Sequence, residues 1–306
     1  MEFFQPILDM SGASFAQHLV NGISLGSLYA MIAIGYTMVY GILLMINFAH
    51  GDIVMMACYF AFFGITVFKI PWYLTFVGVI IATVLLGVLI ERAAYRPLRT
   101  APKNSVLISA IGASFLLENL ANYLFSGRPL RFPEIEVLAQ NIEIAGTQVQ
   151  AISLIIPVVT IICLVILLHV VNKTKIGMSM RAVSKDYEIA RVMGINIDNV
   201  ISMTFAIGSI LAAIGAIMWG IRYPGITPML GVMPGLKCFI AAVIGGVGNI
   251  KGAVLGGFIL GLGEILIVAF FPQLSGYRDA FAFIVLIVIL FYKPTGLLGE
   301  KTTEKV

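Results

Sequence analysis

Charged residues are scarce in this chain, and their scarcity excludes a soluble globular domain. Only 11% of the 306 residues are Asp, Glu, Lys or Arg, whereas 60% are hydrophobic and the mean hydropathy is +1.02. A soluble domain carries about a quarter charged residues. The composition therefore predicts a polytopic membrane protein, and a net charge of +4 is too small to indicate nucleic acid as a partner.

Motifs of enzymes and metal sites are also missing. The chain has no G-x-x-x-x-G-K-[ST] loop, no H-E-x-x-H and no G-x-S-x-G. Its three cysteines, Cys58, Cys163 and Cys238, lie in apolar runs without disulfide or metal spacing. No basic residue precedes Lys69, so a cleaved signal peptide is not expected. The sequence predicts no enzyme and no metal site, and a chain that does not hydrolyse ATP itself.

What the chain does contain is a series of apolar runs. A spanning helix needs about 20 mostly apolar residues. Eight runs reach or approach this length: roughly 17–38, 51–69, 73–93, 105–125, 151–171, 200–220, 252–271 and 279–293. Two shorter apolar pieces, Val39–Ile46 and Phe239–Val247, each precede a polar or glycine-containing turn. These runs predict an all-α polytopic fold with about eight long transmembrane helices plus one or two short or broken ones.

Basic residues gather in three clusters, which orient the spans. The clusters are Arg92, Arg96, Arg99 and Lys103; Lys173, Lys175, Arg181, Lys185 and Arg191; and Lys293, Lys301 and Lys305. The positive-inside rule places all three in the cytoplasm, together with the C-terminus. This orientation requires the piece Phe239–Val247 to cross, which gives nine or ten crossings. The side of the N-terminus stays open.

The loop 173–199 is polar and basic between two apolar runs. Ser184 is a candidate N-cap, Asp186 would lie in the first turn, and Gly194 would end the helix. These signals predict a surface helix over about Lys185–Met193. Its apolar side chains would be Tyr187, Ile189, Ala190, Val192 and Met193. They would fill a groove on a partner protein, or the helix is a solvated connection.

Two acidic residues fall inside apolar runs, where charges are costly and usually face the protein interior. Glu118 has Ser114 and Asn122 one helical turn away on either side, so the three form one polar stripe. Glu264 is placed similarly in the seventh run. Such residues either line a transport path or join helices by hydrogen bonds, and we favour packing.

Two turns complete the set of candidate path or packing residues. The first turn, NFAHGD, begins at Asn47 and ends at Asp52. The second contributes Gly245, Gly246 and Gly248, whose small size favours close helix packing or a broken helix near the path. The order of long run, short piece, turn and two long runs recurs, which indicates a weak internal two-fold repeat with halves 17–125 and 151–293.

Several motifs are distributed over most of the chain. They are NGISLGSLYAMIAIGYTMVYG (Asn21–Gly41), INFAHGD (Ile46–Asp52), ERAAYRPLR (Glu91–Arg99), a loop pattern with Gly177, Arg181, Ala182, Met193 and Gly194, and GGVGNIKGAVLGG (Gly245–Gly257). Together they resemble the permease subunits of branched-chain amino acid ATP-binding cassette transporters. The likeness covers about residues 18–297, and the compact length is similar to the H-type rather than the longer M-type subunit.

The resemblance implies one permease domain, residues 1–306, in an importer of the bacterial inner membrane. Its partners would be an M-type permease, two cytoplasmic ATPases that bind ATP, and an extracytoplasmic substrate-binding protein. The cargo would be leucine, isoleucine or valine, although related permeases carry other amino acids, amides or urea. The implied ATPase-coupling residues are Gly177, Arg181, Ala182, Asp186, Ala190, Met193 and Gly194. An ion-coupled secondary transporter is the rival class, which Glu118 and Glu264 keep open.

Overall fold

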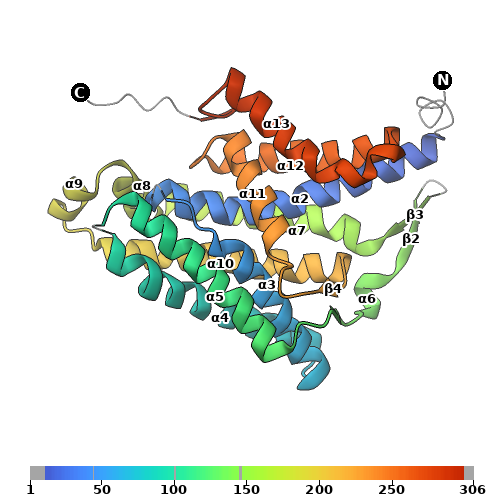
Figure 1. Ribbon diagram of the computed structural model, residues 1–306, viewed down its shortest axis with the longest axis horizontal. Coiled ribbons are helices and arrows are strands. Elements are labelled where there is room, and N and C mark those ends of the chain that lie inside the picture. The colour runs from blue at the N-terminus through green and yellow to red at the C-terminus, as the bar shows by residue number, and fades with distance from the viewer. Residues whose placement is uncertain (1–10, 44, 100, 145–146, 300–306) are drawn as a thin grey trace.

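The computed structural model describes residues 11–43, 45–99, 101–144 and 147–299 (Figure 1). In these residues eight helices are long and apolar enough to cross a membrane, which confirms the all-α polytopic fold. Two small antiparallel sheets accompany them. Their strands are β1 (Leu130–Arg131) with β4 (Gly225–Ile226), and β2 (Asn141–Ile144) with β3 (Thr147–Gln150).

All eight apolar runs fold as helices. They are α2 (Gly12–Leu43), α3 (Ala49–Phe62) with the π-helix η2 (Phe63–Val67), α4 (Trp72–Ile90) with the π-helix η3 (Glu91–Tyr95) and the 3₁₀-helix η4 (Arg96–Leu98), α5 (Lys103–Phe125), α7 (Ala151–Lys173), α10 (Ile197–Arg222), α12 (Ile250–Phe270), and the 3₁₀-helix η5 (Pro272–Tyr277) with α13 (Arg278–Tyr292). The shorter helices are α6 (Glu136–Ala139), α8 (Lys175–Lys185), α9 (Tyr187–Val192) and α11 (Val232–Gly245).

Helix α2 is the centre of the molecule, and it packs most extensively against α12. The two backbones touch: a Cβ on Gly261 would overlap the backbone of Gly26, and one on Gly257 would overlap that of Ala30. Only glycine permits this approach, as expected for helix packing in a bilayer.

The prediction that Val39–Ile46 is a separate short piece is wrong, because Val39–Leu43 continues α2 without a break. The helix has 32 residues, or about 48 Å at 1.5 Å per residue, more than the hydrocarbon thickness of about 30 Å. Neighbouring helices surround most of it. Protein contacts rather than bilayer thickness therefore set its length.

The helices connect two ends of the molecule (Figure 1). The basic end carries α8, α9 and the α4–α5 connection, and the opposite end carries α6 and both small sheets. The Gln17 side chain donates to the Gln148 carbonyl at 3.2 Å, and the Tyr187 hydroxyl donates to the Ile42 carbonyl. Helix α2 therefore begins at the opposite end and finishes beside α9, which places the described start of the chain away from the basic loops.

Helix α11 supplies a ninth passage between the two ends. It follows β4 at the opposite end and finishes at Gly245, whose carbonyl accepts from the Leu298 amide at 2.8 Å. Its 14 residues span only about 21 Å, and α11 runs in the direction that the charge pattern required of the piece Phe239–Val247. The C-terminal segment consequently lies at the basic end with Lys293. Lys301 and Lys305 lie outside the described residues.

We expect the two ends to react from opposite sides of the membrane. With the three native cysteines replaced by alanine, Arg128→Cys at the opposite end should react with an impermeant maleimide in spheroplasts. Val192→Cys, at a site 87% exposed on α9, should react only after permeabilisation, because the positive-inside rule predicts that the basic end faces the cytoplasm. Reaction of Val192→Cys in intact spheroplasts would contradict this orientation.

Candidate transport path and coupling surface

A cavity of about 200 Å³ lies between α3, α5 and α11. Asp52, in the first turn of α3, is buried and accepts a hydrogen bond from the Ser114 hydroxyl of α5. The lining residues are Tyr36, Phe48, Gly51, Asp52, Ser114, Glu118, Gly231, Val232, Gly235, Leu236 and Phe239. The walls are therefore mostly apolar, with a few polar groups contributed by α3 and α5.

Glu118 also lines a second, larger cavity of about 590 Å³. The lining residues there are Phe115, Glu118, Asn119, Asn122, Gly127, Thr227, Pro228 and Met229. Within the described residues Glu118 makes no hydrogen bond or ion pair, whereas Ser114 is tied to Asp52. The polar stripe thus divides: Ser114 joins α5 to α3, and Glu118 with Asn122 faces open space.

Glycine backbones form part of the wall of the first cavity. A Cβ on Gly51 would overlap the Gly231 carbonyl and lie 3.0 Å from the Gly235 Cα. Helices α3 and α11 therefore meet backbone to backbone here, and any larger residue would force them apart.

Glu264 is the centre of a buried ion cluster. Its carboxylate lies 2.9 Å from Lys237 Nζ of α11 and accepts from Arg278 Nε of α13 at 2.8 Å. The Tyr29 hydroxyl of α2 donates to it at 3.1 Å, and Lys237 also pairs with Asp279 at 2.7 Å. The cluster contains two bases and two acids, so its charges balance. Its members come from α2, α11, α12 and α13, so Glu264 joins four helices. Lys237 and Arg278 were missed because nothing in the sequence pairs them with Glu264.

The other turn residues lie nearer the basic end. Asn47, just before α3, accepts a hydrogen bond from the Tyr95 hydroxyl at 2.8 Å. A Cβ on Gly245 would overlap the Gly252 carbonyl, while Gly246 and Gly248 adopt φ values of +108° and +86°. None of the three glycines lines either cavity above. They allow a tight turn and close packing.

The predicted surface helix exists, but its boundaries need correction. Ser184 lies inside α8, and its hydroxyl donates to the Arg181 carbonyl at 3.0 Å. Asp186 is the N-cap of α9, and its carboxylate accepts from the amides of Glu188 and Ile189 at 2.9 and 3.0 Å. The extended backbone of Asp186 ends α8 and lets one side chain satisfy two free amides. Gly194, at φ +80°, follows the end of α9 as expected.

Several residues of this loop face inward and fix the position of α9. Ala190 is buried. The Tyr187 hydroxyl donates a hydrogen bond to α2, and burial raises the pKa of Tyr187 above its usual range. Gly177 packs against the carbonyls at the end of α7, and Arg181 donates to one of them. Ala182 is partly buried.

The outer face of α9 carries three exposed apolar side chains beside the exposed charges of Glu188 and Arg191. The exposed fractions are 61% for Ile189, 87% for Val192 and 75% for Met193. Of the five apolar side chains expected to fill a groove, these three are free to do so, whereas Tyr187 and Ala190 pack inside the chain. An exposed apolar face on a helix held firmly by its other face suits docking to a soluble protein.

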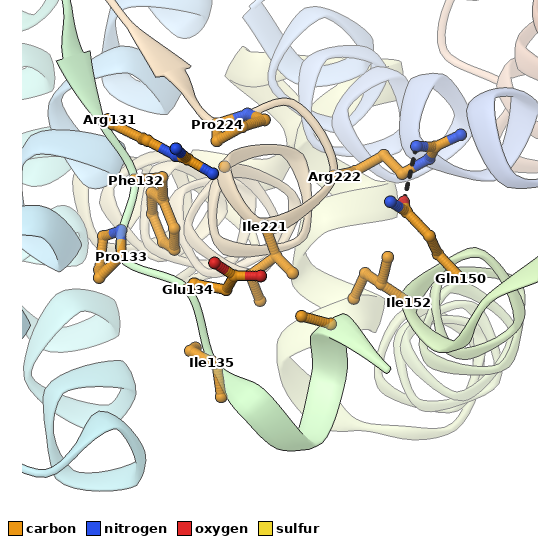
Figure 2. Close-up of a pocket in the computed structure, with 12 residues that line it drawn as sticks. Arg131, Phe132, Pro133, Glu134, Ile135, Gln150, Ile152, Ile221, Arg222 and Pro224 are labelled. Carbon is orange, nitrogen blue, oxygen red and sulfur yellow. Dashed lines mark hydrogen bonds between the residues drawn. The ribbon is translucent and has the colours of Figure 1, made fainter. Parts of the chain in front are cut away.

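A further pocket, of about 150 Å³, lies at the opposite end (Figure 2). Arg131 and Glu134 contribute opposite charges to it, and Arg222 donates to Gln150 Oε1 at 2.8 Å. The pocket shares no lining residue with the two cavities along α5. No local sequence pattern indicated this pocket, because its walls come from three distant stretches of the chain, within residues 131–139, 150–152 and 220–224.

Membrane-spanning helices around cavities whose mostly apolar walls carry a few polar groups are the features of a membrane permease. The sequence model of the branched-chain amino acid transport system permease component matches residues 18–290, and this chain belongs to that family.

Named proteins with similar sequences agree with this family assignment. The chain is 40% identical over 306 residues to the high-affinity branched-chain amino acid transport system permease protein BraD of Pseudomonas aeruginosa, covering 95% of this chain and 98% of the relative. It is 39% identical over 303 residues to LivH of Escherichia coli K12, with the same coverage. A probable LivH of Methanocaldococcus jannaschii is 24% identical over 290 residues, covering 92% and 91%. All three are named as transport permeases, not as enzymes.

Lys237→Met should destabilise the protein, because it leaves buried Glu264 with one cation instead of two. Removing one partner of a buried ion pair costs about 3–5 kcal/mol, and Arg278, which remains, favours the lower figure. The measurement is the melting midpoint in detergent. Lys251→Met, at an exposed lysine, is the control, and Lys237→Arg should restore most of the loss. An unchanged midpoint for Lys237→Met would refute this role.

Proposed function

We propose that this chain is the H-type permease subunit of an ATP-binding cassette importer that translocates branched-chain amino acids across the bacterial inner membrane. The observation that carries the proposal, beside family membership, is the exposed apolar face of α9. A permease without a soluble partner has no use for Ile189, Val192 and Met193 in water, whereas an ATPase groove would bury them.

The orientation supports this assignment. The positive-inside rule places the basic end in the cytoplasm, where α9 would meet one of two ATPases that bind ATP. The opposite end, with α6 and the small sheets, would then face the extracytoplasmic substrate-binding protein. The second permease would be an M-type subunit, and residues 1–306 would form one permease domain.

The two cavities along α5 are the proposed transport path. Their walls combine apolar side chains with Asp52, Glu118 and Asn122, a lining compatible with a small zwitterion that carries an aliphatic side chain. Selection of leucine, isoleucine or valine over other amino acids, amides or urea would be made largely by the binding protein. The path itself would only need to admit the released molecule.

Helix α9 would transmit the movement that ATP binding causes in the ATPases. ATP binding draws the two ATPases together, and the docked helices follow. Because Tyr187 is bonded to the end of α2 and Ala190 is buried, α9 would transfer this movement to the spans instead of sliding over them. The two permeases would then exchange the side to which the path is open.

The rival class, an ion-coupled secondary transporter, gains little support. An ion-coupling carboxylate must exchange its cation during transport, but Glu264 is held by Lys237 and Arg278. Glu118 is the acidic group left facing open space among the residues of the two cavities, and it serves equally as part of an ATP-driven path.

The test is reconstitution with the partner subunits in proteoliposomes. Leucine uptake should require ATP and the binding protein, and should not require an ion gradient. Gly194→Val should reduce ATPase co-purification and uptake, since a β-branched residue at φ +80° costs about 1–3 kcal/mol. Gly194→Asn is the matched control, because asparagine tolerates this backbone and no atom lies within 4 Å of the added Cβ. Uptake by the wild type without ATP would refute the proposal.

Glu118→Gln should lower uptake about tenfold, which corresponds to about 1.4 kcal/mol, while abundance and subunit association stay at wild-type levels. Glutamine keeps the shape and the hydrogen-bonding capacity, so only the charge facing the cavities is lost. Lys251→Gln, at an exposed residue of the first turn of α12, is the control. Lower abundance or a looser complex would instead support the packing role that the sequence favoured.

A further inference from the structure

The motif ERAAYRPLR has no part in the function proposed above, yet its backbone is unusual. Glu91–Tyr95 forms the π-helix η3 and Arg96–Leu98 the 3₁₀-helix η4. Such π turns are rare and frequently occur at functional sites. The segment follows α4 at the basic end and lies immediately before α5.

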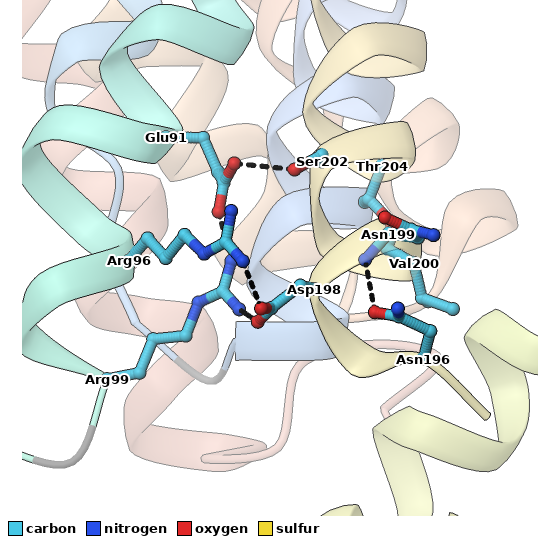
Figure 3. A network of polar contacts seen from close by, with 9 residues as sticks. All are labelled: Glu91, Arg96, Arg99, Asn196, Asp198, Asn199, Val200, Ser202 and Thr204. Carbon is cyan, nitrogen blue, oxygen red and sulfur yellow. Dashed lines mark hydrogen bonds and ion pairs between the residues drawn. The ribbon is translucent and has the colours of Figure 1, made fainter. Parts of the chain in front are cut away.

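The charged side chains of this motif bind the first turn of α10 (Figure 3). Arg96 and Arg99 both pair with Asp198, and Arg99 also pairs with Glu91. Glu91 is completely buried and accepts a further hydrogen bond from the Ser202 hydroxyl at 2.7 Å. Two bases and two acids thus form one neutral cluster across the α4–α10 contact.

The cluster lies directly after the docking helix. Asp198 belongs to the first turn of α10, whose N-cap Asn196 accepts from the Asn199 amide at 3.1 Å. The Ile195 amide donates back to the Ala190 carbonyl of α9 at 3.1 Å. Since only three residues separate the C-cap of α9 from the start of α10, a displacement of α9 acts at once on Asp198.

The same segment contacts α3 and α5, two of the three helices that enclose the first cavity. The Tyr95 hydroxyl donates to Asn47 Oδ1 at 2.8 Å, immediately before α3. The Ser109 hydroxyl of α5 donates to the Ala94 carbonyl at 2.8 Å. Further along these two helices, Asp52 and Ser114 meet at the cavity. The π-helical turn is therefore bonded to α10 on one side and to α3 and α5 on the other.

We propose that Glu91, Arg96, Arg99 and Asp198 are positioning residues that join the start of α10 to the η3–η4 segment, so that movement of docked α9 reaches α3 and α5. The proposal rests on the proposed function and names its internal coupling element. Arg99 is suited to the role because it is mostly buried between two carboxylates. Releasing it would leave the buried Glu91 charge without its cation, which is strongly unfavourable.

Asp198 is the residue to test, because its side chain is 43% exposed and its loss leaves the buried Glu91–Arg99 pair intact. Exposed ion pairs contribute little to stability. Asp198→Asn should therefore keep wild-type abundance, melting midpoint and ATPase co-purification. It should lower the number of leucine molecules taken up per ATP hydrolysed by at least about fivefold, the lower end of typical coupling effects.

The assay uses the complete reconstituted complex with both permeases, both ATPases and the binding protein. Asp198→Glu retains the charge and should keep most of the wild-type ratio. Arg92→Gln should keep all of it, because Arg92 is an exposed residue of the same motif and forms no ion pair within the described residues. A wild-type ratio in Asp198→Asn would overturn the proposal. A lowered uptake-to-hydrolysis ratio that is matched by a lower melting midpoint or less ATPase co-purification would also overturn it, because the cluster would then have only a structural role.

Failure of the function itself would be recognised separately. It would be visible in the wild-type complex, as absence of ATP-dependent uptake, before any substitution is made. That result would remove the basis of this inference together with the proposed function.

Discussion

The backbone contact between α2 and α12 is the constraint on which the other features depend. Lipid tails are as apolar as leucine, so no hydrophobic force draws helices together inside a bilayer, and close packing must do so. Gly26 against Gly261 and Ala30 against Gly257 provide that packing. With α12 fixed on one side, α2 can extend from the β2–β3 hairpin to α9 and serve as the reference for both ends.

The buried charges divide into two groups by their surroundings. Glu264 and Glu91 have no exposed surface. Lys237 and Arg278 from two other helices neutralise Glu264, and Arg99 at the end of the same span neutralises Glu91. Such pairs hold helices in register, because separating them would leave a bare charge in a medium that cannot solvate it. Glu118 lacks a basic partner in the described residues and borders open volume. This contrast, and not acidity alone, is the reason for proposing Glu118 as a residue of the transport path.

The spans could be predicted from the sequence because bilayer thickness imposes a length on every lipid-facing run. This length rule failed at Val39, because α2 is enclosed by protein there and bilayer thickness does not limit its length. The end of α9 at Gly194 was also predictable, since a left-handed residue has a local signature. The pairing of Lys237 with Glu264, or of Asp198 with Arg99, could not be predicted from the sequence. Those contacts depend on how distant helices are packed, which no local pattern encodes.

The same packing separates a rigid half from an adjustable one. Helices α2 and α12 touch along their backbones, so they cannot shift without unmaking that contact. Helices α3 and α5 instead border a cavity, and they meet through side chains such as Asp52 with Ser114. A force applied at α9 would therefore be absorbed by the second group. The position of η3, bonded to that group and not to α12, agrees with this division.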